Sequence, residues 1–126
     1  MAVQLEHVGI PASKENLAEV VAFYREHFGW TTVREIGDPP AMIFVSDGAG
    51  GRLEIYVAAG EPMAHPAHLA FAVGIDEFDA LLERMAAAGV DFDSVAQNPA
   101  GDKLAFFNDP HGNRAQIVGR LEPMPQ

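Results

Sequence analysis

The sequence predicts an α+β fold of two tandem βαβββ modules, which form a curved mixed sheet around a central cleft. Three observations lead to this prediction. Two segments carry apolar residues at helical spacing, and the other apolar stretches are short runs rich in β-branched and aromatic residues. The order strand, helix, strand, strand, strand then occurs twice in a chain of 126 residues, the length of one ordinary domain.

The two predicted helices have clear ends in the sequence. In the first, "SKENLAEVVAFYREHFG" has helical spacing, with Ser13 as the expected N-cap and Gly29 as the stop. In the second, "DEFDALLERMAAAG" has the same spacing between an Asp76 cap and a Gly89 stop. Each helix is expected to lay its apolar face on a sheet.

Breakers rich in Gly, Pro, Asn and Asp separate the predicted strands. The strands are predicted at residues 3–10, 31–36, 41–47, 52–58, 68–73, 90–95, 104–108 and 113–119. A connector with Pro and Gly at 58–67 divides the chain near its middle. We therefore expect a single domain made of a first module at about 1–58, a second at about 68–119 and a tail at 120–126.

The two halves also align residue by residue. His7 corresponds to His68 at an offset of 61, and Glu54 corresponds to Gln116 at an offset of 62. The segments "GRLEI" and "NRAQI" overlap at the second offset. An internal repeat of this kind predicts a duplicated supersecondary unit.

Four polar side chains occupy equivalent positions in the repeat. Because side chains alternate along a strand, His7, Glu54, His68 and Gln116 face away from the bulkier apolar residues of their strands, such as Ile55. The duplication places that face inside the predicted cleft. Two imidazoles, one carboxylate and one amide oxygen fit a divalent ion such as Zn, Ni, Mn or Fe(II).

Composition excludes several classes of partner. Eight Lys and Arg against eighteen Asp and Glu give a net charge of −10, which opposes binding to nucleic acid and to anionic membranes. No apolar run approaches the roughly 20 residues of a membrane helix. The chain has no cysteine and its start lacks the pattern of a secretory signal, so a cytoplasmic location is expected.

Several strings in the chain resemble a known family. They are "LEHVGI" at 5–10, "FYREHFGW" at 23–30, "RLEIYV" at 52–57, "HLAFAV" at 68–73 and "FNDPHGNRAQIV" at 107–118. In this order and spacing, over residues 3–119, the chain resembles the vicinal oxygen chelate superfamily. That superfamily includes glyoxalase I, bleomycin-resistance proteins, fosfomycin-resistance proteins and extradiol dioxygenases.

The resemblance implies a metal site and a reaction. The family's ligand positions correspond to His7, Glu54, His68 and Gln116, and the last of these is commonly a glutamate that acts as the main base. An amide can coordinate but cannot accept a proton, so Glu54 is the remaining candidate base. The implied activity is that of a metal-dependent lyase or isomerase, which moves a proton on a small molecule chelated through vicinal oxygens.

Further residues on the same face are candidates for substrate binding. Arg52 and Arg114 precede Glu54 and Gln116 by two positions, so they share that face and are expected to hold a substrate carboxylate. The candidate pocket walls are Tyr56 and Phe106.

Other functions fit parts of the same pattern. A metal-free protein of the bleomycin-resistance type would use the acidic surface to sequester a cationic drug. An Fe(II) ring-cleaving dioxygenase would use His7, His68 and Glu54 as two histidines and one carboxylate. A binding domain that retains vestigial ligand residues is a third alternative. The resemblance also implies a homodimer, in which the two modules pair within one chain or across two.

Overall fold

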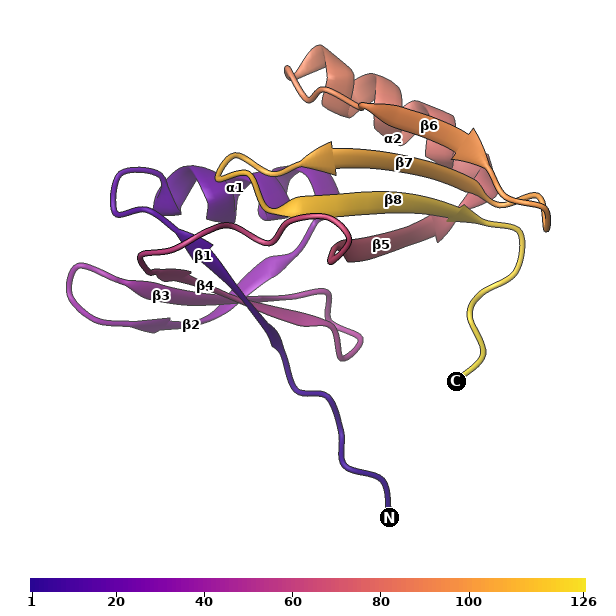
Figure 1. Cartoon of the computed structure of the whole chain (residues 1–126). Coiled ribbons are helices and arrows are strands. Elements are labelled where there is room, and N and C mark those ends of the chain that lie inside the picture. The colour runs from indigo at the N-terminus through magenta and orange to yellow at the C-terminus, as the bar shows by residue number, and fades with distance from the viewer. The chain divides into compact units, whose positions relative to one another are not determined.

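The computed structural model describes all 126 residues and contains two helices and eight strands (Figure 1). The elements are β1 (Val8–Ala12), α1 (Leu17–Phe28), β2 (Thr31–Ile36), β3 (Met42–Ser46), β4 (Arg52–Val57), β5 (Leu69–Gly74), α2 (Ile75–Ala87), β6 (Ser94–Gln97), β7 (Lys103–Asn108) and β8 (Arg114–Arg120). They form two four-stranded sheets with the orders β1-β4-β3-β2 and β5-β8-β7-β6. The predicted α+β fold of two tandem βαβββ modules is confirmed.

Both sheets are built in the same way. The first strand of each module pairs in parallel with the last one, β1 with β4 and β5 with β8, and the other pairs are antiparallel. In the first module α1 packs on β3 and β4, and its Val20 and Tyr24 are fully buried with Ile10 and Ile55 of the sheet. The opposite face of β4 carries Glu54, as the alternation predicts.

The second module repeats this core. Helix α2 packs on β5 and β8, and its Phe78 and Met85 are buried with Phe107 and Ile117 of the sheet. Neither helix of the chain has the length and apolar character needed to cross a membrane.

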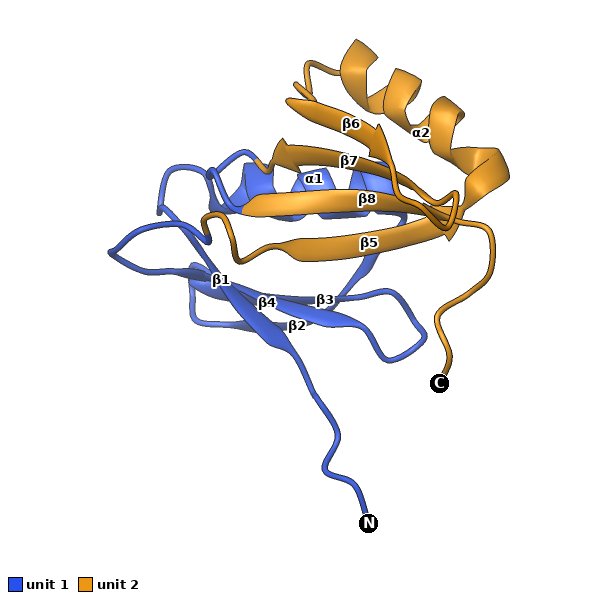
Figure 2. Cartoon of the chain, turned by 45° about the vertical axis from the view of Figure 1, so that its right-hand side comes forward, with its two compact units in different colours: residues 1–63, 110–113 blue, residues 64–109, 114–126 orange.

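The chain divides into two compact units, and a short segment from the second half of the chain belongs to the first unit. Unit 1 consists of residues 1–63 and 110–113, and unit 2 consists of residues 64–109 and 114–126 (Figure 2). The segment 110–113 is fixed in unit 1 by Asn113, which is fully buried. Its Oδ1 accepts a hydrogen bond from the backbone N–H of Met63 at 2.9 Å, and its Nδ2 donates to the carbonyl of Pro11 at 3.0 Å.

The predicted start residues of two strands are wrong. A strand begins only where its backbone pairs with a neighbouring strand, and in both cases that pairing begins later than predicted. The strand predicted at 3–10 begins at Val8, where the parallel pairing with Leu53 begins, and Val3 is 97% exposed. The strand predicted at 90–95 is β6, four residues later. The chain at Val90 instead donates its N–H to Met85 and closes the end of α2.

The predicted N-caps are also wrong, whereas both glycine stops are confirmed. Ser13 and Asn16 exchange hydrogen bonds between side chain and backbone, so the turn ends at Asn16, which is the N-cap of α1. Helix α2 begins after Gly74, and Asp76 lies in its first turn, where a carboxylate stabilises the helix dipole. Gly29 directly follows α1 and Gly89 follows the C-cap of α2, Ala88, and both glycines have positive φ.

Gly119 allows α2 to approach β8 closely, and replacing it is expected to destabilise unit 2. A Cβ at Gly119 would lie 2.9 Å from Cβ and Cδ2 of Phe78, a side chain that is only 1% exposed. We expect Gly119→Ala to lower the free energy of unfolding by about 1–3 kcal/mol, the usual cost of overpacking a core. Urea unfolding followed by circular dichroism measures this change.

Gly74→Ala is the matched control for this prediction. Gly74 has negative φ, and a Cβ there would meet no atom within 4 Å. If Gly119→Ala unfolds at the same urea concentration as Gly74→Ala, close packing of α2 on Gly119 does not limit stability.

Candidate functional site

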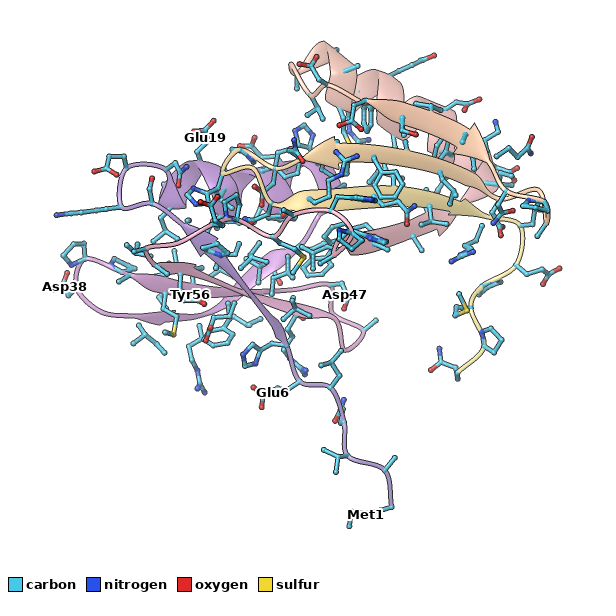
Figure 3. The ribbon with its side chains drawn as sticks, viewed as in Figure 1. Met1, Glu6, Glu19, Asp38, Asp47 and Tyr56 are labelled. Atoms are coloured by element: carbon cyan, nitrogen blue, oxygen red, sulfur yellow. The ribbon has the colours of Figure 1, made fainter.

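The first candidate ligand, His7, lies directly before β1 and faces Glu54 of β4. Its Nε2 is 3.9 Å from Oε2 of Glu54, and its Nδ1 is 2.8 Å from Oε1 of Glu6. Glu6 lies on the extended segment that leads into β1 (Figure 3). Since Glu6 offers a carboxylate as acceptor, it favours the tautomer of His7 that donates through Nδ1 and leaves the lone pair on Nε2.

The second histidine, His68, is held in a similar way in unit 2. It lies directly before β5, and its Nδ1 is 3.0 Å from the carbonyl oxygen of Pro66. A carbonyl only accepts, so Nδ1 donates and Nε2 of the neutral ring is available as a ligand. Histidines that bind metals commonly have their other ring nitrogen fixed by such an acceptor.

Each histidine also contacts a phenylalanine at equivalent positions of the repeat. Phe44 meets His7 with ring centroids 5.4 Å apart and planes at 88°, and Phe106 meets His68 at 5.3 Å and 76°. Phe44 pairs across the strands with Glu54, and Phe106 pairs in the same way with Gln116. The duplication has therefore preserved a local arrangement of histidine, phenylalanine and ligand candidate in both units.

The separation of His7 and Glu54 fits a shared metal ion. Two atoms that bind one ion at about 2.1 Å each can be no more than about 4.2 Å apart, and Nε2 and Oε2 are 3.9 Å apart. Space beside Glu54 depends on Gly9, because a Cβ there would come within 3.3 Å of both Oε1 of Glu54 and Cε1 of Tyr56. Tyr56 shares the face of β4 that carries Glu54.

Gln116 is buried without a hydrogen bond. The residue is 8% exposed, and its side-chain amide makes no hydrogen bond in the structure. The only side-chain N or O atom that is both buried and without a hydrogen-bond partner is Nε of Arg114, so the amide atoms of Gln116 keep contact with solvent. The amide oxygen is therefore accessible and available to a ligand.

The two predicted substrate-binding arginines differ in their surroundings. Arg114 donates to both carboxylate oxygens of Asp93, at 2.6 and 2.8 Å, and its guanidinium lies 4.9 Å from the centre of the Phe106 ring. The hydrogen bonds with Asp93 raise the pKa of Arg114 and lower the pKa of Asp93. Arg52 has no carboxylate partner, and its Nη1 donates to the carbonyl of Glu6 at 3.2 Å.

The structure thus brings some of the predicted residues together. His7 lies against Glu54 in unit 1, and His68, Phe106 and Arg114 form a contact series in unit 2. Nowhere do three or more His, Asp or Glu side chains gather as a metal-binding cluster.

Sequence reasoning missed two of the residues around these side chains, Glu6 and Asp93. The position of Glu6 could have been noticed in the sequence, since it is a carboxylate directly before the ligand candidate His7. Nothing in the sequence marks Asp93 as the partner of Arg114.

Comparison with known proteins assigns the family. The family model described as Glyoxalase/Bleomycin resistance protein/Dioxygenase superfamily matches residues 4–117. The chain belongs to this superfamily. The expected resemblance to the vicinal oxygen chelate superfamily is thereby confirmed, and no curated protein was found to match in sequence.

Solved structures of this superfamily share the fold. Oxidase ChaP-H2 is 26% identical, with 95% of each chain covered and a TM-score of 0.75. The fosfomycin resistance protein FosX from Listeria monocytogenes, an E-to-Q mutant complexed with Mn(II) and 1S,2S-dihydroxypropylphosphonic acid, is 21% identical, with 97% and 94% covered and a TM-score of 0.78. Lactoylglutathione lyase from Agrobacterium tumefaciens is 20% identical, with 94% and 92% covered and a TM-score of 0.72.

Proposed function

We propose that this superfamily member is a divalent-metal-dependent lyase or isomerase that moves a proton on a small molecule chelated through vicinal oxygens. The proposed ligands are His7, Glu54, His68 and Gln116. The observation that carries the proposal is that both histidines have Nδ1 fixed by an acceptor and Nε2 available, at equivalent positions of the repeat. The ligands come from both units, so the proposal requires the units to combine within one chain or in a homodimer.

The residues have separate roles in this proposal. The bound ion, Zn, Ni, Mn or Fe(II), would polarise two adjacent oxygens of the substrate and acidify a carbon-bound proton. Glu54 would accept that proton on a carboxylate oxygen and return it to the neighbouring carbon. Arg52 would bind an anionic group of the substrate, and Tyr56 and Phe106 would form walls of the pocket.

The amide at position 116 changes the charge of the site. Two neutral histidines and two carboxylates would neutralise a divalent ion, whereas His7, His68, Glu54 and Gln116 leave a charge of +1. A positive site favours substrates that become anionic during the reaction, such as an enolate. The Mn(II) and the vicinal diol named for FosX support this choice of cofactor and substrate class.

Metal content tests the proposal directly. We expect tag-free protein reconstituted with Mn(II), Zn(II) or Ni(II) to hold about one ion per site by elemental analysis, and His7→Ala to lose it. His27→Ala is the control, because His27 lies on α1 and contacts Phe23. Circular dichroism verifies that both variants fold.

Other outcomes redirect the function. Protein that never holds a metal contradicts the proposed enzyme. Binding of a cationic drug that chelators do not disturb would then support drug sequestration. A protein that binds neither a metal ion nor a cationic drug would support a vestigial site.

One observation supports a second candidate reaction. The similarity at 26% identity to a protein named as an oxidase supports a reaction with oxygen. In that reaction His7, His68 and Glu54 would hold Fe(II) as two histidines and one carboxylate. Oxygen consumption with catechols after loading with Fe(II), compared with loading with Zn(II), distinguishes ring cleavage from proton transfer.

A further inference from the structure

We propose that Arg114 is a positioning residue for His68 and acts through Phe106, with Asp93 holding it in place. This inference rests on the proposed function, in which His68 is a metal ligand. The two arginines of the repeat then have different roles. Arg114 positions His68, and Arg52 remains the residue that binds an anionic group of the substrate.

The first step of the argument is the fixation of Arg114 by Asp93. Both terminal nitrogens of Arg114 donate to Asp93, one to each carboxylate oxygen, and Nη1 also lies 3.4 Å from Oδ1 of Asn108. The Arg114 side chain is 17% exposed, and its remaining donor, Nε, is buried without a partner. A half-buried guanidinium with a bidentate carboxylate partner keeps one orientation and is poorly placed to release Asp93 for a substrate anion.

The second step is the contact of Arg114 with the Phe106 ring. The guanidinium carbon lies 4.9 Å from the ring centroid, within the range of a cation–π interaction. Phe106 lies on β7 opposite Gln116, and it also meets the ring of His68 at 5.3 Å. Phe106 therefore connects the fixed guanidinium to the imidazole.

The third step is the difference between the two histidines. Nδ1 of His7 meets the charged carboxylate of Glu6, whereas Nδ1 of His68 meets only the neutral carbonyl of Pro66. Hydrogen bonds to charged acceptors are the stronger ones. Glu6 is 76% exposed, so solvent screens part of this difference. His68 is the histidine that has no charged acceptor at Nδ1, and its phenylalanine carries a fixed cation.

Unit 1 offers an internal comparison. Phe44 contacts His7 with nearly the same geometry as Phe106 contacts His68, yet no cation lies over Phe44. Arg52 is the repeat equivalent of Arg114, and its Nη1 donates to the backbone carbonyl of Glu6. Its other N–H groups remain available to bind an anion.

The test compares Asp93→Asn with Asp91→Asn. Asp91 makes no ion pair or hydrogen bond in the structure, so its variant makes the same change of charge in the same segment. In metal-free protein we expect Asp93→Asn to shift the NMR signals of the His68 ring and leave those of His7 unchanged. Competition with a chelator should then show Mn(II) bound about tenfold more weakly by Asp93→Asn, the usual effect of losing an outer partner of a ligand.

Two further variants sharpen the result. Asp93→Glu keeps the charge and should restore part of the Mn(II) affinity. Phe106→Leu should lower the affinity at least as much as Asp93→Asn, because it removes the contact through which Arg114 acts.

The outcomes separate this inference from the proposed function. Unchanged His68 signals in Asp93→Asn, or equal shifts at His7 and His68, overturn the positioning role of Arg114. A wild-type protein that binds no Mn(II) overturns the metal site, while the His68 signals of the metal-free variants still decide whether Arg114 positions that ring.

Discussion

Glu54→Gln is expected to lower the rate of proton transfer by a factor of about 10² to 10⁴, the usual contribution of a positioned general base. The amide keeps an oxygen that can reach the ion, as Gln116 is proposed to do, but it cannot accept a proton at neutral pH. The substitution therefore separates loss of the base from loss of a ligand. Exchange of the carbon-bound proton of an α-hydroxy carbonyl substrate with D2O, followed by NMR, measures the step directly.

The control for this prediction is Glu61→Gln. Glu61 is exposed and makes no ion pair or hydrogen bond, so its loss removes one charge without touching the site. Glu54→Gln that binds metal and exchanges the proton at the wild-type rate would show that another group is the base.

Gln116→Glu is expected to raise the affinity for a divalent ion by about tenfold or more. The substitution replaces a neutral oxygen ligand with a charged one of the same shape, and the attraction of close opposite charges outweighs the cost of burying one more carboxylate beside a cation. It also gives the site a second possible base, at the position where the family commonly has one. Titration with Mn(II) against a competing chelator measures the affinity.

Gln126→Glu is the matched control, because Gln126 is an exposed residue at the end of the chain that makes no hydrogen bond. If Gln116→Glu and Gln126→Glu bind Mn(II) equally, Gln116 does not contact the ion. The proposed ligand set would then reduce to His7, Glu54 and His68.

The sequence predicted the parts of the fold that depend on local periodicity. Alternation along β4 depends on neighbouring residues alone, so the opposite faces of Glu54 and Ile55 are correctly predicted. The start of β1 depends on where its pairing with β4 begins, at Val8 and Leu53. The sequence near Val3 does not show where that pairing begins. The choice of cap at Asn16 depends on a turn geometry that several polar residues of the same segment could form.

The surroundings of the candidate site were harder to predict for the same reason. His7 and Glu54 could be placed on one face from their parity and the repeat. The pairing of Arg114 with Asp93 crosses from β8 to the chain before β6, a segment whose strand was itself misplaced. Contacts between elements that are distant in sequence follow from the folded arrangement, and the sequence of a single chain does not reveal them.

The segment 110–113 makes unit 1 a body encoded by two separate stretches of the gene. A chain cut after Met63 would hold all the strands of the first sheet, yet the N–H of Met63 and the carbonyl of Pro11 would have lost the side chain that bonds both. The two halves of the sequence repeat are therefore not independent structural units, because the first half lacks a segment of unit 1. Each half of the gene encodes a sheet and a helix. The second half also encodes residues 110–113, which complete unit 1.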